Sequence, residues 1–306
     1  MSNIASKNIF TVLNTIIDFI RYGITEAQRY QVFYGHGTDN PWDDIWSLIS
    51  GLLNLPFDCN PIIFHANLTL EEKNIIFEKL QQRIIERIPV PYLLKKASFC
   101  DLSFYVDERV LIPRSPIAEL IRQQFSPWID PNNISKILDM CTGSGCIAIA
   151  CCYNFDDITV DAVDISADAL AVAKINCDNH HLNAQINLLQ SNSFEKLPKV
   201  LYDVIIANPP YVGDDEMSTL PLEYTHEPDL ALRATNNGLT IIENILKHAH
   251  EYLAAHGVLI MEVGNSQEEL IIQYPEVPFI WLEFEYGGSG VLMLRYDELV
   301  KFYKFF

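Results

Sequence analysis

The sequence KILDMCTGSG, residues 136–145, joins an apolar segment to a turn that contains two glycines. The segment Lys136–Met140 is typical of a buried parallel strand. Gly143 and Gly145 allow the backbone to turn tightly and to approach a ligand closely. A helix that begins after them presents unpaired backbone N–H groups to such a ligand. The stretch therefore predicts a strand, a ligand-binding turn and a helix in succession.

Strands and helices continue to alternate after this stretch. The predicted strands are Lys136–Met140, Thr159–Asp164, Ile186–Gln190, Asp203–Ala207, Gly257–Val263, Phe279–Glu285 and Val291–Arg295. The predicted helices are Cys146–Tyr153, Ala167–Asp178 and Leu239–Ala255. This alternation predicts an α/β fold with a doubly wound parallel sheet. Residues 286–290 (YGGSG) join the last two strands without a helix, which predicts a terminal antiparallel hairpin.

The first 95 residues show the pattern of a small helical domain. Apolar residues recur at helical spacing over residues 9–20, a segment that includes Phe10, and a second apolar segment covers residues 44–55. Thr69 is a candidate cap for a third helix, because acidic residues follow it in the first turn. Glycine, asparagine and proline residues separate these segments. Residues 1–95 therefore predict several short helices.

The pattern changes again between the helical region and the α/β region. Residues 96–116 include apolar residues of strand type around a polar centre, and they predict a β-hairpin that links two domains. Residues 117–306 then form the α/β domain.

Two polar positions follow the next strands of the α/β domain. Asp164 ends the second strand about twenty residues after the glycine turn, where a carboxylate can accept hydrogen bonds from ribose hydroxyls. The alternative is that Asp164 caps the following helix, a role for which Ser166 competes. Asn192 and Ser193 follow the third strand, where they could frame an adenine ring or form a turn without a ligand.

The sequence NPPY, residues 208–211, ends the fourth strand. Pro209 and Pro210 cannot donate hydrogen bonds to a sheet, so the strand stops there rigidly. The Asn208 side-chain oxygen and nearby carbonyls can accept the hydrogens of a planar NH2 group, and Tyr211 can pack on its face. The alternative is a rigid strand exit without a ligand. The motif by itself favours neither a nucleic-acid base nor a side-chain amide.

Composition limits the class of protein. The chain has 306 residues, 49% hydrophobic residues and a net charge of −19. This charge argues against a nucleic-acid partner, which basic residues would have to bind, and is compatible with a basic protein partner. Seven cysteines without a C-x-x-C pair indicate reduced, buried thiols in a cytoplasmic protein. No segment is long and apolar enough to predict a membrane span.

The histidines add little to these expectations. His226 lies in a polar loop after the NPPY motif and could act as a base, although loop histidines are more often solvated or structural. His180 and His181 follow a predicted helix, where the helix dipole is a sufficient explanation. No spacing of histidine, cysteine and acidic residues indicates a metal site.

Several segments together resemble the protein-glutamine methyltransferases, a family that modifies peptide chain release factors and one ribosomal protein. These segments are residues 87–92, 104–117, 138–149, 163–173, 208–212, 223–228, 262–266 and 287–291. The resemblance implies a Rossmann-like, seven-stranded class I methyltransferase domain, preceded by a small helical domain, and an enzyme that uses S-adenosyl-L-methionine. It implies that Cys141, Thr142, Gly143, Ser144, Gly145, Asp164, Asn192, Ser193 and Asn208 bind this cofactor. It implies that Asn208, Pro209, Pro210 and Tyr211 hold the substrate amide.

The substrate is expected from smaller differences within the family. Cys141, where many relatives have glycine, and Arg114-Ser115-Pro116 favour the branch that methylates the third large-subunit ribosomal protein, a basic protein. Asn192 stands where the family commonly has aspartate. The alternatives are a release-factor methyltransferase, an adenine-specific DNA methyltransferase and a non-catalytic ribosome-assembly protein. Intact Gly143, Gly145, Asp164 and Asn208 argue against the last.

Overall fold

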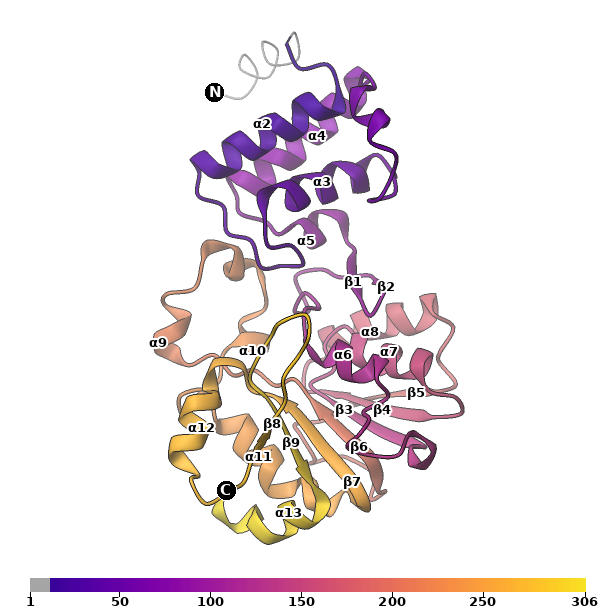
Figure 1. The fold of residues 1–306 in the computed structure, drawn as a ribbon, viewed down its shortest axis with the longest axis vertical. Coiled ribbons are helices and arrows are strands. Elements are labelled where there is room, and N and C mark those ends of the chain that lie inside the picture. The colour runs from indigo at the N-terminus through magenta and orange to yellow at the C-terminus, as the bar shows by residue number, and fades with distance from the viewer. Residues whose placement is uncertain (1–11) are drawn as a thin grey trace. The chain divides into compact units, whose positions relative to one another are not determined.

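The computed structural model describes residues 12–306, which form two compact units (Figure 1). The first unit contains the chain up to Lys96 and also Pro221–His226. The second contains Ala97–Leu220 and Glu227–Phe306. The return of residues 221–226 to the first unit is a feature that no local pattern predicts. Phe10, in the first expected helix, lies outside the described residues.

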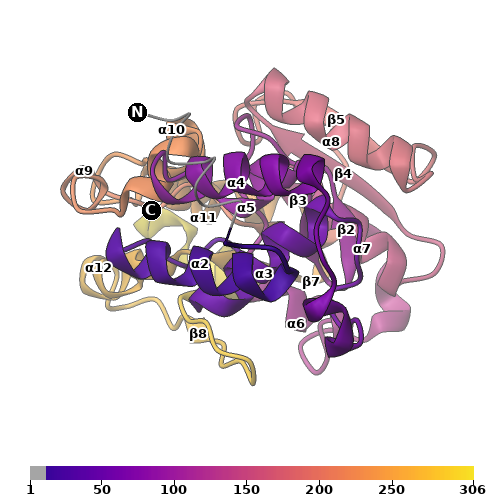
Figure 2. The same ribbon diagram turned by 90° about the horizontal axis from the view of Figure 1, so that it is seen from above.

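The first unit is built from short helices, which Figure 2 shows from above. Their bounds are α2 Ile16–Arg29, α3 Pro41–Leu52, α4 Leu70–Ile84, α5 Val90–Leu94, and the 3-10 helices η1 Pro61–His65 and η3 Leu222–His226. Thr69 caps α4 as expected, because its side chain accepts the Glu72 N–H while Glu72 accepts the Thr69 N–H. Apolar side chains of α2, α3 and α4, among them Phe19, Ile45 and Ile76, form one core.

The helix expected over residues 9–20 differs from the structure in the part that the structure describes. Residues 12–15 are not helical, and α2 begins at Ile16 and continues to Arg29. The reason is a second capping box, in which Thr15 and Asp18 bond each other's backbone N–H groups. Leu13 precedes this cap, yet it is buried in the same core. Apolar spacing therefore located the buried side chains correctly but not the start of the helix.

The second unit contains a seven-stranded sheet in the order β5-β4-β3-β6-β7-β9-β8. The strands are β3 Lys136–Met140, β4 Thr159–Asp164, β5 Ile186–Gln190, β6 Tyr202–Ala207, β7 Leu253–Glu262, β8 Ile280–Trp281 and β9 Val291–Arg295. The first five are parallel, and β9 is antiparallel to β7 and β8. The expected terminal hairpin is confirmed. A separate hairpin, β1 Ala97–Phe99 with β2 Leu102–Phe104, precedes the sheet.

Helices cover both faces of this sheet (Figure 1). One core joins α6 Ile117–Arg122, α7 Cys146–Asn154 and α8 Ala167–Asn179 to alternate strand residues such as Ile137. The other joins α11 Thr240–His248, α12 Gln267–Gln273 and α13 Tyr296–Phe302 to the intervening residues, such as Leu138. Successive strand residues point to opposite faces, so a sheet buried on both sides needs continuous apolar strands. The short helices α9 Asp214–Met217 and α10 Asp229–Leu232, together with η2 Pro131–Asn133, η4 Ala249–Glu251, η5 Gly264–Ser266 and η6 Tyr303–Phe305, complete the unit.

Three expected elements of the second unit are wrong in extent, and one of them is the strand expected over 257–263, which is Leu253–Glu262 in the structure. The helix expected over 239–255 ends at His248, and β7 already begins at Leu253. Leu253 pairs with Tyr202 in the sheet, and this pairing overrides the helical preference of the alanines that follow. The strand expected over 279–285 pairs only at Ile280 and Trp281, because it lies at the edge of the sheet beside β9.

All seven cysteines are free. Cys146, Cys151 and Cys177 are buried, whereas the other four are partly exposed, so the expectation of buried thiols holds for only three of them. Over residues 12–306, no group of three or more potential metal ligands is present, and no helix has the length and apolar character to cross a membrane.

Candidate functional site

Three strand ends meet at one edge of the sheet in the second unit. β3 lies between β4 and β6, so the glycine turn, Asp164 and Asn208 follow adjacent parallel strands. Ligands in open α/β sheets bind at this carboxyl edge. One cavity opens there, and its lining includes Cys141–Ser144, Asp164, Asn192, Ser193, Asn208 and Pro210. Gly145, Pro209 and Tyr211 do not line it. The fold therefore brings most of the expected site residues together.

Hydrogen bonds hold the glycine turn in place. The Thr142 N–H donates to the Val163 carbonyl, and the Thr142 hydroxyl donates to Asp139 at 2.5 Å. Gly143 has a φ of +54°, and a side chain there would meet open space. Its backbone can therefore approach a ligand in the cavity without steric hindrance. Cys141 also adopts a left-handed backbone, with a φ of +61°, in which glycine would be less strained.

Asp164 faces this cavity from the end of β4. One carboxylate oxygen accepts the Gly143 N–H and the other accepts the Ser166 N–H, both at 2.9 Å. Ser166, and not Asp164, caps α8 through the Ala169 N–H. Burial raises the pKa of the Asp164 carboxyl, and the groups that oppose this shift are backbone N–H groups, among them those of Ser166 and Gly143. Asp164 therefore supports the turn and remains available to ligand hydroxyls.

Asn192 and Ser193 line the cavity beyond the end of β5. The Asn192 side-chain nitrogen donates to Glu195 at 2.8 Å, and this leaves the amide oxygen for another partner. Ser193 has a φ of +48°, which belongs to a tight turn.

The residues of the NPPY motif have different surroundings: some line the cavity, and Tyr211 packs against other residues of the protein. Asn208 is half-buried in the cavity lining, and no hydrogen bond engages its side chain within residues 12–306. Tyr211 instead donates to Glu262 at 3.1 Å, and Ser115 donates to the other oxygen of Glu262 at 2.5 Å. The Tyr211 ring lies against Gly264, where an added Cβ would come within 2.4 Å of a ring carbon. Tyr211 thus packs on the protein in this structure, and not in the cavity.

Two arginines that were not predicted as site residues also line the cavity. Arg114 forms a bidentate pair with the buried Glu227 at 2.6 and 2.7 Å, and Glu227 also accepts the Ile112 N–H. Arg109 pairs with Asp107 and holds the pKa of that carboxyl to about 2. Arg114 and Glu227 are 113 residues apart in the sequence. The one sign of them in the sequence is that both lie in segments that resemble the protein-glutamine methyltransferases.

Two further buried groups support the turn from below. The Asn176 amide on α8 donates to the carbonyls of Ser144 and Tyr105 and accepts the Tyr105 N–H. Asp139 is fully buried beside the turn, and burial raises its pKa to about 7. No sequence pattern distinguished Asn176, because a polar residue inside a helix usually faces solvent.

The histidines lie elsewhere. His226 belongs to the first unit, where its ring nitrogen meets the Glu86 carbonyl at 2.8 Å, and it does not line the cavity. His180 contacts Tyr153 and the Ser103 carbonyl, so it does more than follow a helix end.

Comparison with known proteins agrees with this fold. The model of the methyltransferase small domain family matches residues 124–223. The ribosomal protein uL3 glutamine methyltransferase of Francisella tularensis is 46% identical over 297 residues, which cover 97% of this chain and 95% of that protein. The protein of the same name from Xanthomonas campestris is 44% identical and covers 94% and 93% of the two chains.

A similar fold occurs among solved structures of low sequence identity. The catalytic domain of hMettl16 in complex with a MAT2A 3'UTR hairpin has a TM-score of 0.48 and 16% identity, with 78% of this chain and 87% of that chain covered. The two methyltransferases of Francisella tularensis and Xanthomonas campestris, in contrast, match almost the entire chain. The expected Rossmann-like methyltransferase fold is confirmed by the seven-stranded sheet and by these relatives. The chain belongs to the family of ribosomal protein uL3 glutamine methyltransferases.

Proposed function

We propose that this protein transfers a methyl group from S-adenosyl-L-methionine to the side-chain amide nitrogen of a glutamine in the third large-subunit ribosomal protein, uL3. The family supports the activity and the substrate. The observation that carries the site assignment is the Asn208 amide, which has no partner within residues 12–306 and faces a cavity beside Asp164 and the glycine turn.

The cavity suits this cofactor. Gly143 leaves open space where a side chain would intrude, and Asp164 offers carboxylate oxygens that can accept ribose hydroxyls. Asn192 and Ser193 provide polar atoms, and apolar side chains such as Ile165 supply a surface for an adenine ring. When bound, the cofactor would supply an electrophilic methyl group on a sulfonium sulfur. We assign cofactor binding to Cys141–Gly145, Asp164, Asn192 and Ser193, with Gly145 acting through the turn geometry.

Asn208 and the following prolines would orient the glutamine. An amide nitrogen is a weak nucleophile, because its lone pair is delocalised into the carbonyl. The Asn208 side-chain oxygen and the Pro209 carbonyl would accept its two N–H hydrogens and aim the nitrogen at the methyl group. These acceptors also stabilise the positive charge that develops on nitrogen as its bond to carbon forms and the carbon–sulfur bond breaks. The amide proton then leaves to solvent, so no strong general base is needed.

Tyr211 contributes by position. Its hydroxyl is held by Glu262 and its ring lies against Gly264, so it braces the end of the rigid motif. In this proposal Pro210 forms part of the wall of the cavity, and the adjoining Pro209 supplies the second carbonyl acceptor.

Charge supports a basic protein substrate. Of the 40 acidic and 21 basic residues of the chain, the second unit contains 29 and 12. The second unit therefore has a net charge of −17, which is nearly all of the net charge of −19 of the chain. A basic ribosomal protein would be attracted to it, with an association rate that falls as salt is added. We assign recognition of the protein substrate to the helical residues 1–95, and we place the protein in the cytoplasm with its substrate.

The decisive experiment is a labelling assay. The protein is incubated with methyl-labelled S-adenosyl-L-methionine, ribosomal proteins from a strain that lacks this activity, and peptide chain release factors as competitors. We expect label on uL3, at a glutamine identified by mass spectrometry. Label on a release factor alone would contradict the proposed substrate. Label on nucleic acid, or failure to bind the cofactor, would contradict the proposed activity.

A further inference from the structure

The chain leaves the second unit and returns to it close to the cavity. Asn208 and Pro210 line the cavity, and Val212 then pairs with Arg233. Residues 221–226 belong to the first unit. The chain re-enters the second unit at Glu227, which Arg114 holds, and Pro228 again lines the cavity. Residues 221–226 therefore form a short segment of the helical unit that is followed, at Pro228, by a residue of the cavity lining.

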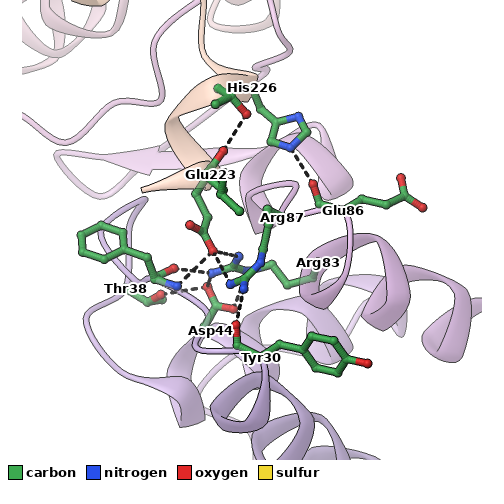
Figure 3. Close-up of polar contacts among 11 residues, drawn as sticks. Tyr30, Thr38, Asp44, Arg83, Glu86, Arg87, Glu223 and His226 are labelled. Atoms are coloured by element: carbon green, nitrogen blue, oxygen red, sulfur yellow. Dashed lines mark hydrogen bonds and ion pairs between the residues drawn. The ribbon is translucent and has the colours of Figure 1, made fainter. Parts of the chain in front are cut away.

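Glu223 anchors this segment inside the helical unit (Figure 3). Its side chain is only 1% exposed. One of its oxygens accepts the Phe33 N–H at 3.0 Å and the Arg87 guanidinium at 3.1 Å, with Arg83 at 3.5 Å. His226 adds a hydrogen bond to the Glu86 carbonyl. These hydrogen bonds thus connect residues 221–226 to residues of the same unit that lie about 140 positions earlier in the sequence.

The cluster is electrically balanced only when Glu223 is present. Arg83 is 1% exposed and bonds both oxygens of Asp44, at 2.8 and 3.2 Å, as well as the Phe33 carbonyl. Arg87 also donates to the Tyr30 carbonyl. Two arginines therefore face two carboxylates, and removal of Glu223 leaves one carboxylate for both. A buried ion cluster of this kind specifies one arrangement of the chain more than it adds net stability.

We propose that Glu223 is a positioning residue that fastens the segment 221–226 to the helical unit and so connects this unit twice to the catalytic cavity. The other connection is the chain from Ala97 onward, in which Arg109–Leu111 and Pro113–Ser115 line the same cavity. A second tether, which the ion contacts of Glu223 hold in place, limits the freedom of the helical unit more than the chain connection at residues 96 and 97 alone would. A substrate held by the helical unit then has a higher effective concentration at Asn208.

This inference rests on the proposed methylation of a protein substrate, and it predicts a division between kinetic parameters. Release of the segment should raise KM for the protein substrate about tenfold, because the effective concentration falls. The cofactor dissociation constant should not change, because Arg114 and Glu227 hold the cavity wall independently within the second unit. The value of kcat, measured at saturating protein substrate, should also be unchanged.

The test uses Glu223→Ala in the full-length protein, with Asp215→Ala as the matched control. Asp215→Ala also removes one negative charge, but from an exposed side chain between Val212 and Pro221. Glu223→Ala leaves excess positive charge in the cluster, so the double variant Glu223→Ala/Arg87→Ala is measured as well. In the double variant one positive charge, on Arg83, again faces one negative charge, on Asp44, while residues 221–226 still lack the contacts of Glu223. Hydrogen exchange of residues 221–226 reports whether they are released.

The expected result is a raised KM in both Glu223 variants, with faster exchange of 221–226, and unchanged kinetics in Asp215→Ala. Wild-type KM in the double variant with 221–226 released would overturn the inference. So would an equal rise in KM and in the cofactor dissociation constant. If the wild-type protein labels no protein substrate, the proposed function fails instead, and the two failures are therefore distinguishable.

Discussion

Glu223 in the first unit and Asp164 in the second are both shielded carboxylates, but their surroundings differ. Glu223 meets two arginines and a backbone N–H, and it belongs to a closed ion cluster. Asp164 accepts the backbone N–H groups of Gly143 and Ser166, forms no ion pair within residues 12–306 and faces a cavity. Burial alone therefore does not identify a ligand-binding acid. The distinction is whether neighbouring groups of the protein already satisfy the charge.

The largest effect is expected at the closed cluster. Arg83→Met leaves Asp44 buried without its main cation, and the first unit should lose about 3–5 kcal/mol of stability. Hydrogen exchange should rise in α2, α3 and α4, while cofactor affinity, which depends on the second unit, stays the same. Arg122→Met is the control, because its ion pair with Asp101 is exposed. Equal stability of the two variants would show that the cluster is not structural.

Asn208→Ala tests the open site of the second unit. Loss of the amide should lower the single-turnover rate of methyl transfer by about 10²–10³-fold, as for removal of one oriented polar group in other active sites. Stability should change little, because no hydrogen bond of the described residues depends on this side chain. Asn179→Ala, at an exposed helix end, is the control. An unchanged transfer rate would exclude the assigned role.

Asp139 is a third case, a buried acid that forms no ion pair within residues 12–306 and does not line the cavity. Its pKa of about 7 exceeds the ordinary value of about 4, so the native state binds this proton more tightly than the unfolded chain. The resulting stabilisation is complete below about pH 4 and is lost as the pH rises through about 7. The variant Asp139→Asn has no group at this position that can ionise. Its free energy of unfolding, relative to that of wild type, should therefore increase by about 2 kcal/mol as the pH is raised from about 5 to 8.

Urea unfolding at several pH values measures this difference, with the exposed Asp156→Asn as the control. Parallel curves of stability against pH for wild type and Asp139→Asn would contradict the raised pKa.

Asp164→Asn should weaken cofactor binding by about tenfold or more, because hydrogen bonds to a charged acceptor are stronger than those to a neutral one. The asparagine oxygen can still accept one backbone N–H, so the turn should survive. Calorimetric titration with S-adenosyl-L-methionine measures the effect. Asp168→Asn, on an exposed position of the following helix, is the control, and equal affinity of both variants would remove Asp164 from the site.

Tyr211→Phe should have the smallest effect. It removes one hydrogen bond to Glu262, worth about 1 kcal/mol, and should slow methyl transfer about fivefold while the ring packing on Gly264 remains. Tyr153→Phe, which removes a hydroxyl at an exposed contact with His180, should be neutral. A loss in Tyr211→Phe as large as that in Asn208→Ala would mean that the tyrosine hydroxyl contacts the substrate.

Local patterns predicted much of the second unit. The bounds of β3, β4, β5 and β9 agree with their expected ranges, because strands buried on both faces must be continuous apolar runs. The edge strand β8 has fewer constraints, and its extent was wrong. The start of α2 was also missed, because a capping box depends on Thr15 and Asp18 and not on apolar spacing.

The cavity residues were predicted for the same topological reason. Residues that follow neighbouring parallel strands must meet at one edge, so Gly143, Asp164 and Asn208 could be grouped from the sequence. Their supports could not. Asn176, Glu227 and Glu262 contact partners that lie 32 to 147 residues away, and a polar residue carries no local sign of such a partner.

The sequence by itself determined the alternating fold, the glycine turn and the rigid NPPY exit, because strand burial, glycine conformations and proline geometry act over a few residues. Only the tertiary structure determined which charges remain free. It turned Tyr211 toward Glu262, gave the capping role to Ser166, and placed Glu223 among Arg83 and Arg87 of the helical unit. Charge satisfaction depends on all neighbours in space, and a folded chain draws those neighbours from distant parts of its sequence.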